Sequence, residues 1–246
     1  MPQPAPARHR ASVVLRAVGA VLVVGVVALS AGCSLTSAPV DGSDQMHGGV
    51  PSSGADVAPV SPPVEEDPML HVSDVTVAGT EVAVMTTSKG VVKLEFFADD
   101  APNTVASFIE LAESGLYDEV KFHRVISGFV AQAGDPQTKD LSTERVVEVV
   151  GLQDQGVYQP GDPRLGTGGP GWMMKAEFNE RPHETGTLAM ARSAAVDSAG
   201  SQFYICLAPQ PRLDGQYTVF GRVIDGMDVV ATLAVGDVIE SVVIER

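Results

Sequence analysis

Short runs in which apolar and polar residues alternate fill the C-terminal two thirds of the chain. Across residues 92–96, apolar side chains alternate with the charged Lys93 and Glu95, which is the period of a half-buried β-strand. Residues 81–86 are similarly rich in β-forming residues, and turn-forming residues at 87–90 join the two runs into a predicted hairpin. Further runs of this kind occur at residues 120–125, 129–133, 187–190, 202–207, 219–224 and 237–245. The pattern therefore predicts eight strands.

Two segments instead carry apolar residues at every third or fourth position, the spacing of an amphipathic α-helix. The first begins near Pro102 and is broken at Gly115, and the second begins near Met227 and ends at Gly236. Eight strands with only two helices cannot alternate as a doubly wound sheet requires. A mainly β domain, built as a closed barrel or as a sandwich, remains.

One long segment, residues 135–171, shows few strand signals and many turn-forming residues. A segment of this length without regular structure is typical of a functional or ordered surface loop. We expect it to lie on the surface beside the functional site.

The first residues of the chain have the pattern of an export signal. Three arginines, Arg8, Arg10 and Arg16, precede an uncharged apolar run at residues 17–29. At about 1.5 Å per residue this run is too short for a hydrocarbon core of about 30 Å, which disfavours a spanning helix. Removal of the segment is the preferred interpretation, and an uncleaved anchor is the alternative.

The run Leu29-Ser30-Ala31-Gly32-Cys33 follows, and it resembles the lipobox of bacterial lipoproteins. In that class, small residues precede a cysteine that is lipidated and becomes the mature N-terminus, although Ser30 stands where leucine is most common. The resemblance implies a signal peptide at residues 1–32, lipidation of Cys33, and attachment to the bacterial cell membrane on its periplasmic or extracellular face. Ordinary cleavage that leaves a free thiol is the alternative.

Residues 33–78 are rich in Pro, Gly, Ser and Asp, and they contain neither Lys nor Arg. Such a segment cannot bury enough apolar surface to fold by itself. We therefore expect a disordered tether at residues 33–78 and a folded domain at residues 79–246.

The charge balance excludes one large class of partners. The chain has 31 acidic and 16 basic residues and a formal charge of −15, so it is repelled by phosphate backbones and we expect no nucleic-acid partner. Removing residues 1–32 deletes three arginines and no acid, which lowers the charge to −18. Anionic lipids would not attract this surface, so membrane attachment depends on the lipid at Cys33.

The common catalytic and metal-binding patterns are not found in the sequence. There is no Gly-x-Ser-x-Gly elbow, no His-Glu-x-x-His helix and no lysine after the glycine-rich run at residues 166–171, which we interpret as a turn. Two cysteines are too few for a disulfide framework or a zinc cluster, and Cys206, in an apolar run, is interpreted as an inert buried thiol. We expect neither a metal nor a cofactor.

An arginine within an apolar strand, Arg124, is the most informative residue. Alone, it would be interpreted as one half of a structural ion pair, because an unpaired buried guanidinium is costly. Its neighbours change this interpretation. The ordered runs are Phe122-His123-Arg124, Gly128-Phe129, Gln132-Ala133-Gly134-Asp135, Gly200-Ser201-Gln202-Phe203 and Leu213-Asp214-Gly215. Together they resemble cyclophilins, the cyclosporin-binding class of peptidyl-prolyl cis-trans isomerases.

The resemblance covers residues 81–246 and implies an eight-stranded antiparallel β-barrel capped by two α-helices. It implies that the chain isomerises X-Pro bonds without a covalent intermediate, as a monomer that assists the folding of exported proteins. By the same resemblance, Arg124 and Gln132 are catalytic. The residues implied to bind the substrate are Phe129, Val130, Ala191, Arg192, Gln202, Tyr204, Leu213 and Tyr217.

Three positions depart from the family pattern. Tyr204 replaces the usual phenylalanine, so its hydroxyl needs a partner if it is buried. Arg212 stands where cyclosporin-sensitive members have tryptophan, and Tyr217 stands where many have histidine, which implies weak cyclosporin binding. A module or chaperone on the cell surface that holds proline-containing segments without catalysis is the alternative function.

Overall fold

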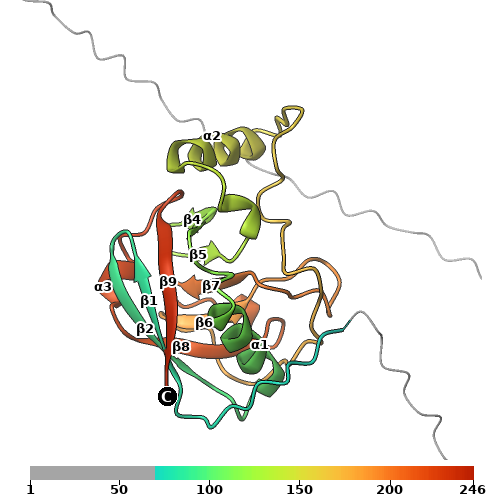
Figure 1. The fold of residues 1–246 in the computed structure, drawn as a ribbon, viewed down its shortest axis with the longest axis vertical. Coiled ribbons are helices and arrows are strands. Elements are labelled where there is room, and N and C mark those ends of the chain that lie inside the picture. The colour runs from blue at the N-terminus through green and yellow to red at the C-terminus, as the bar shows by residue number, and fades with distance from the viewer. Residues whose placement is uncertain (1–69) are drawn as a thin grey trace, which may run out of the picture. The chain divides into compact units, whose positions relative to one another are not determined.

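A curled antiparallel sheet of nine strands organises residues 70–246, the part of the chain that the computed structural model describes (Figure 1). The strands are β1 (Val82–Thr87), β2 (Gly90–Phe96), β3 (Val120–Lys121), β4 (Arg124–Ile126), β5 (Val130–Ala133), β6 (Thr187–Met190), β7 (Phe203–Cys206), β8 (Val219–Asp225) and β9 (Val238–Glu245). Their order in the sheet is β3-β9-β1-β2-β8-β6-β7-β5-β4. The predicted mainly β fold is confirmed.

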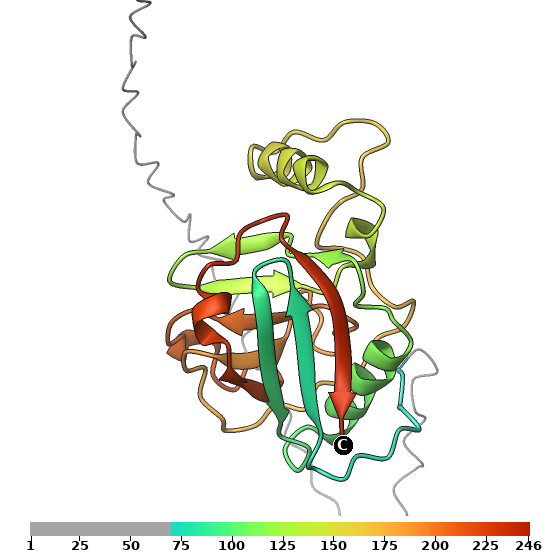
Figure 2. The ribbon, with the colours of Figure 1, turned by 60° about the vertical axis from the view of Figure 1, so that its left-hand side comes forward.

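The predicted hairpin is formed by β1 and β2, which lie beside β9 in Figure 2. Alternate side chains of β2, including Val92 and Leu94, are fully buried, as the sequence pattern requires. Gly90 closes the turn with a φ of 140°, a conformation that side chains rarely allow. The hydroxyl of Thr87 donates to the carbonyl of Gly90 at 2.8 Å and fixes the turn.

The expectation of eight strands is wrong by one, because the run at residues 120–125 divides into β3 and β4. Strand β3 pairs with β9 at one edge of the sheet, whereas β4 pairs with β5 at the other edge. The chain crosses between the two edges at Phe122 and His123. The amide of Phe122 donates to the carbonyl of Asp237, and the amide of His123 donates to the carbonyl of Gln132. Each edge thus takes one half of the run.

The number of α-helices also differs from the expected two, because residues 70–246 contain three. Helix α1 (Pro102–Glu113) is confirmed, and it packs Val105, Phe108 and Ile109 against the sheet. The second predicted helix is the single turn α3 (Met227–Val230). Helix α2 (Thr143–Asp154) lies in the long segment that was expected to be irregular.

Helix α2 has only a weak apolar pattern, because Val146 and Val149 are its only buried residues. The side chain of Ser142 caps its first turn. Contacts from elsewhere in the chain hold it: Thr143 donates to the carbonyl of Gly236 at 2.9 Å, and Arg145 pairs with Asp162. We call residues 136–165 the α2 segment. Two short 3₁₀ turns complete the fold, η1 (Pro136–Thr138) and η2 (Pro211–Leu213).

Strand β7 separates two apolar clusters. Phe203 and Ile205 belong to the main core between the sheet and α1, where Phe203 packs edge-on against Phe108. Tyr204 and Cys206 face a smaller cluster on the other side of the strand. Burial raises the pKa of Cys206 to about 12, so its thiol stays protonated at neutral pH.

Residues 70–78, which were expected to belong to the tether, run along the domain in an extended conformation. The ring of His71 stacks on Trp172 with 3.9 Å between the ring centres, and its Nε2 lies 2.9 Å from Oε2 of Glu110. Val75 and Val77 pack against the main core.

The expected signal peptide, Cys33 and the rest of the tether lie outside the described residues. No helix within residues 70–246 has the length and apolar character needed to cross a membrane.

Candidate active site

The sheet register brings the key polar residues into one row. Arg124 on β4 lies opposite Gln132 on β5, and Gln132 lies opposite Tyr204 on β7. Residues directly opposite one another in an antiparallel sheet project from the same face. The strand order therefore places three residues that are distant in sequence side by side.

A central cavity of about 160 Å³ opens on this face. The residues that line it are Arg124, Phe129, Val130, Gln132, Ala191, Arg192, Tyr204, Leu213 and Tyr217. Nine of the ten predicted site residues in the domain thus surround one cavity. The tenth, Gln202, lies beside it and lines a larger cavity of about 570 Å³ together with Gln132. A small cavity with apolar walls and a few fixed polar groups is typical of a ligand site.

Arg124 is held at the rim of the central cavity by neutral partners. Its guanidinium carbon lies 5.2 Å from the centre of the Phe129 ring, and its Nη1 donates to Oε1 of Gln132 at 3.3 Å. The amide of Gln132 donates in turn to Oε1 of Gln202 at 3.0 Å. Gln202 donates to the carbonyl of Gly168 at 2.8 Å. Arg124 forms no ion pair with any carboxylate of residues 70–246, so its charge faces the cavity uncompensated.

The floor of the central cavity is Tyr204, whose hydroxyl lies 3.0 Å from Nε2 of His183. The other ring nitrogen of His183, Nδ1, lies 2.9 Å from Oδ1 of Asp214. Burial raises the pKa of Tyr204 well above its ordinary value, so the phenol stays neutral. The sequence predicts a partner for this hydroxyl if it is buried, and that partner is the buried His183.

The family comparison agrees with this geometry. The family described as "Cyclophilin type peptidyl-prolyl cis-trans isomerase/CLD" matches residues 82–246. The chain is a cyclophilin. It is therefore a peptidyl-prolyl cis-trans isomerase, as the sequence resemblance implied.

Relatives and solved structures of this cyclophilin support the assignment. A peptidyl-prolyl cis-trans isomerase of Synechococcus elongatus is 43% identical over 162 residues, which are 65% of this chain and 93% of the relative. Peptidyl-prolyl cis-trans isomerase B of Bacillus subtilis is 39% identical over 156 residues, covering 63% and 90%. The crystal structure of a Cryptosporidium parvum cyclophilin, solved in the presence of the dipeptide Ala-Pro, matches with a TM-score of 0.54 at 26% identity. It covers 67% of this chain and 99% of that one.

Two of the three departures from the family pattern line this cyclophilin's central cavity, Tyr204 at its floor and Tyr217 at its rim. Tyr217 lines the cavity, and the guanidinium of Arg192 lies 4.8 Å from the centre of its ring. Arg192 also donates from Nε to the carbonyl of Gln216 at 3.0 Å. Arg212, on η2, is exposed and does not line the central cavity. The cavity lining thus also includes an arginine stacked on a tyrosine.

The glycine-rich run at residues 166–171 borders the larger cavity, and a buried carboxylate holds it. Oδ2 of Asp135 accepts the amides of Gly166 at 2.6 Å and Gly168 at 3.2 Å, and Oδ1 accepts the amide of Gln137 at 2.8 Å. A Cβ at Gly168 would lie 2.1 Å from Oδ1 of Asp135, so only glycine fits there. Asp135 therefore fastens the two ends of the α2 segment together.

Sequence reasoning missed His183 and Asp135 as supporting residues of the site. Both act through partners that are distant in sequence, which no local spacing could reveal. The available signals were the hydroxyl of Tyr204, which required a buried partner, and the position of Asp135 at the end of the run Gln132-Ala133-Gly134-Asp135.

Proposed function

We propose that this cyclophilin isomerises X-Pro bonds in exported proteins, with Arg124 acting on the prolyl nitrogen. The observation that carries the proposal is the position of the Arg124 guanidinium at the rim of a 160 Å³ cavity, held by Phe129 and Gln132. The cavity has the size and apolar lining that a pyrrolidine ring needs. The partners are therefore proline-containing segments of polypeptides.

The physical task is to weaken the partial double bond of an amide. Delocalisation of the nitrogen lone pair into the carbonyl creates a barrier of about 18–20 kcal/mol, and uncatalysed X-Pro exchange takes tens to hundreds of seconds. In the twisted transition state the lone pair is localised on nitrogen. A fixed cation that donates to this nitrogen stabilises the twisted state more than the planar one. Arg124 suits this role because guanidinium stays protonated at any working pH.

The remaining residues hold the substrate while the bond rotates. Phe129, Val130 and Leu213 give the proline ring apolar walls, and Tyr204 closes the floor. Gln132 and Gln202, with Ala191 and Arg192 nearby, offer polar contacts to the backbone on one side of the proline. No covalent intermediate, metal or cofactor is required, because no bond other than the hydrogen bonds forms or breaks.

Arg124→Ala tests the proposal. We expect kcat/KM for isomerisation of a short X-Pro peptide to fall about 100-fold, the usual loss when one preorganised donor is removed. Arg246→Ala is the matched control, because Arg246 is an exposed arginine that pairs with Glu113 away from the cavity. Equal rates for the wild type and Arg124→Ala would reject the assigned role. Peptide binding without a catalysed rate in the wild type would favour the non-catalytic module or chaperone.

We also propose that the chain is exported and anchored through a lipid on Cys33. The support is the sequence alone: the arginines before an apolar run, and the run of small residues before Cys33. The mass of the mature N-terminus tests this directly, since lipidation adds acyl groups to a chain that begins at Cys33. Cys33→Ala should move the protein from the membrane fraction to the soluble fraction. An unmodified cysteine at the mature terminus would reject the anchor.

A further inference from the structure

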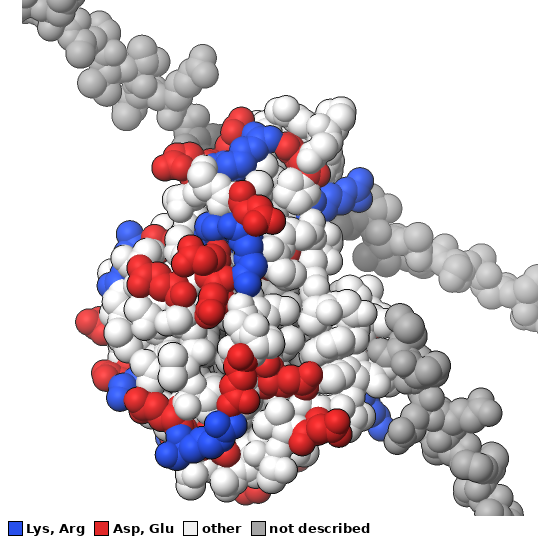
Figure 3. All heavy atoms as spheres, viewed as in Figure 1, with Lys and Arg blue, Asp and Glu red and all other residues white. Residues whose placement is uncertain are grey.

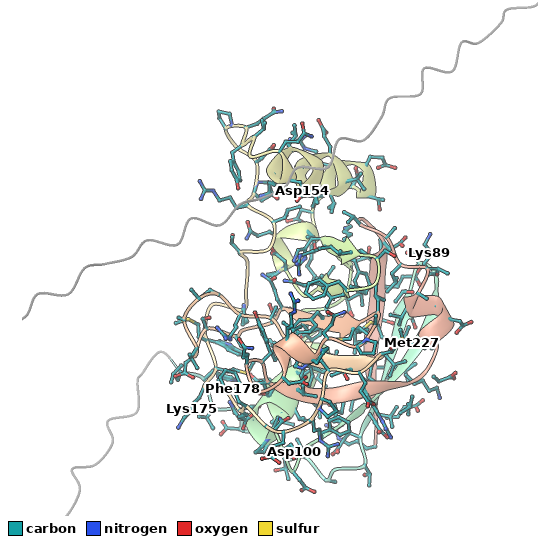
Figure 4. The ribbon with its side chains drawn as sticks, turned by 180° about the vertical axis from the view of Figure 1, so that it is seen from behind. Lys89, Asp100, Asp154, Lys175, Phe178 and Met227 are labelled. Carbon is teal, nitrogen blue, oxygen red and sulfur yellow. The ribbon has the colours of Figure 1, made fainter. Side chains whose placement is uncertain are left out.

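A groove of about 440 Å³ lies on the other side of Arg124, between strand β4 and the α2 segment. We call it the α2 groove. The residues that line it are His123, Arg124, Val125, Ile126, Gln132, Val150, Gln153, Asp154, Tyr158, Arg164, Leu165, Gly166, Thr167 and Val235. Figure 4, in which Asp154 is labelled, shows α2 standing above the sheet at this end of the domain. The outer wall of the groove is therefore the α2 segment, to which no function was assigned from the sequence.

The α2 groove adjoins the central cavity. Arg124 and Gln132 line both, so the two spaces share a wall. An extended polypeptide advances about 3.3 Å per residue. A substrate with its proline in the central cavity can therefore place a residue a few positions away from the proline in the α2 groove. The larger 570 Å³ cavity, which Arg124 does not line, borders the α2 groove at Gly166 and Thr167.

The charges of the groove are unusual for this acidic chain. Of the eight arginines of residues 70–246, four form an ion pair with a carboxylate, namely Arg145, Arg181, Arg222 and Arg246. Figure 3 shows such basic and acidic side chains next to one another on the face that it views. Of the four that form no ion pair within the described domain, Arg124 and Arg164 line the α2 groove, whereas Arg192 and Arg212 do not. Asp154 is the only carboxylate among the lining residues, so cations outnumber acids two to one.

Arg164 is positioned by an aromatic ring and not by a carboxylate. Its guanidinium carbon lies 5.0 Å from the centre of the Tyr158 ring. Stacking of this kind fixes the plane of a guanidinium and leaves its N–H groups free to donate. Arg164 can therefore bind a carboxylate without first losing another one.

The wall of the α2 groove combines a buried imidazole with apolar side chains. His123 is 5% exposed, and neither of its ring nitrogens has a hydrogen-bond partner within residues 70–246. Its Nε2 edge faces Gly166, where a side chain would lie 3.6 Å from it. Both nitrogens are shielded from solvent, so His123 is part of the groove wall and we assign it no contact with an occupant. Val150 and Leu165 supply the apolar surface for the stem of a side chain.

We propose that the α2 groove binds an acidic residue that flanks the proline of the substrate, with Arg164 as the residue that selects it. The inference rests on the proposed function, because it assumes that the central cavity holds the proline. The substrate class thus becomes X-Pro segments with an aspartate or glutamate a few residues from the proline on one side.

The test compares peptides that differ only in one charge. Each peptide has about ten residues and one central X-Pro bond, with Glu, Gln or Lys at the third position before or after the proline. For the mature wild-type chain at low salt, we expect kcat/KM to decrease from Glu to Gln to Lys in one of the two series. The Glu-to-Lys ratio should be about three- to tenfold, the range of partly exposed charge pairs, and it should shrink in high salt.

Charge reversal at Arg164 gives the decisive comparison. The ratio should fall to about one in Arg164→Gln and invert in Arg164→Glu, whereas the control Arg246→Gln, with the same loss of charge, should keep the wild-type ratio. Because the readout is a ratio within each variant, a general loss of activity or of folded protein cancels. A ratio that survives both Arg164 variants, or one that is absent from both wild-type series, would overturn the proposal. If kcat/KM changed by the same factor for all six peptides in the Arg164 variants, the proposal would also be overturned, since Arg164 would then not discriminate between peptides by their charge. Failure of the proposed function is distinct, because the wild type would then isomerise none of the peptides.

Discussion

The hydroxyl of Tyr204 lies 3.0 Å from Nε2 of His183, deep under the central cavity. His183 also contacts Oδ1 of Asp214 twice, through Nδ1 at 2.9 Å and through its backbone amide at 2.8 Å. Asp214 directly follows Leu213, a wall of the same cavity. One buried histidine thus fixes both the floor and a wall of the space that we assign to the proline ring.

We expect His183→Ala to destabilise the fold and to weaken substrate binding. The substitution leaves the Tyr204 hydroxyl buried without its partner, which costs about 1–3 kcal/mol. Urea unfolding should show this loss, and KM should rise more than kcat falls because Leu213 loses its support. Adding Tyr204→Phe removes the hydroxyl, so the double variant should lose less stability than the sum of the two single losses. Strictly additive losses would contradict the connection between the two residues.

Gln132 is expected to act as a positioning residue for Arg124. Gln132→Ala removes the acceptor at 3.3 Å from the guanidinium and the donor to Gln202, so the cation samples more orientations. We expect kcat to fall about tenfold with little change in the free energy of unfolding, because Gln132 is only half-buried. Gln159→Ala, at an exposed position of the α2 segment, is the control. A loss of stability without a loss of kcat would show that Gln132 has a structural role only.

The parts of the fold that could be predicted are those in which local pattern and burial agree. The β1–β2 hairpin and α1 each bury one side. The apolar residues of that side recur every two residues in the strands and every three to four residues in the helix. The division of residues 120–125 depends on which strands pair with each half, and those partners lie far away in the sequence. Helix α2 buries only two side chains, so its position depends on contacts such as Thr143 with Gly236, which leave no periodic signal.

The lining of the site was predictable for a different reason. Its residues occur in short runs on β4, β5 and β7 or in the loops and the 3₁₀ turn between strands, and the family pattern specifies those runs one by one. The support beneath the site was not predictable, because His183 reaches Tyr204 from a loop that shares no spacing with it. The α2 groove also could not be predicted from the sequence, because it forms between the α2 segment, which contributes Arg164, and β4, which contributes Arg124.

Asp135 should be essential for the α2 segment. Its carboxylate accepts amides at both ends of that segment, from Gln137 and from Gly166 and Gly168, and it is completely buried. Asp135→Ala leaves these amides without their acceptor, and we expect a loss of about 3 kcal/mol or more in the free energy of unfolding. Limited proteolysis should cut within residues 136–165 faster than in the wild type.

The control for Asp135 is a substitution of similar shape. Asp135→Asn keeps one acceptor oxygen and turns a donor toward the remaining amides, so its loss should be intermediate. If Asp135→Ala were cut no faster than the wild type within the α2 segment, the carboxylate would not be what closes that segment.

His123 should make the stability of the fold dependent on pH. Burial lowers the pKa of His123, because the imidazolium would lose its hydration, and the Arg124 cation acts in the same direction while Asp135 opposes both. In the unfolded chain a histidine titrates near pH 6.5. Below that pH the unfolded state therefore binds a proton that the folded state does not.

The free energy of unfolding should then decrease as the pH falls below about 6.5, and His123 should contribute no pH dependence above it. His123→Gln keeps a polar side chain of similar size that cannot titrate, so its stability should change less across the same range. Urea unfolding of both proteins from pH 8 to pH 5 tests this. The difference between the two curves isolates His123 from the other four histidines of the sequence, because the substitution leaves them unchanged. Parallel curves would mean that His123 binds its proton equally well in the folded and unfolded chain, and burial would then not control its charge.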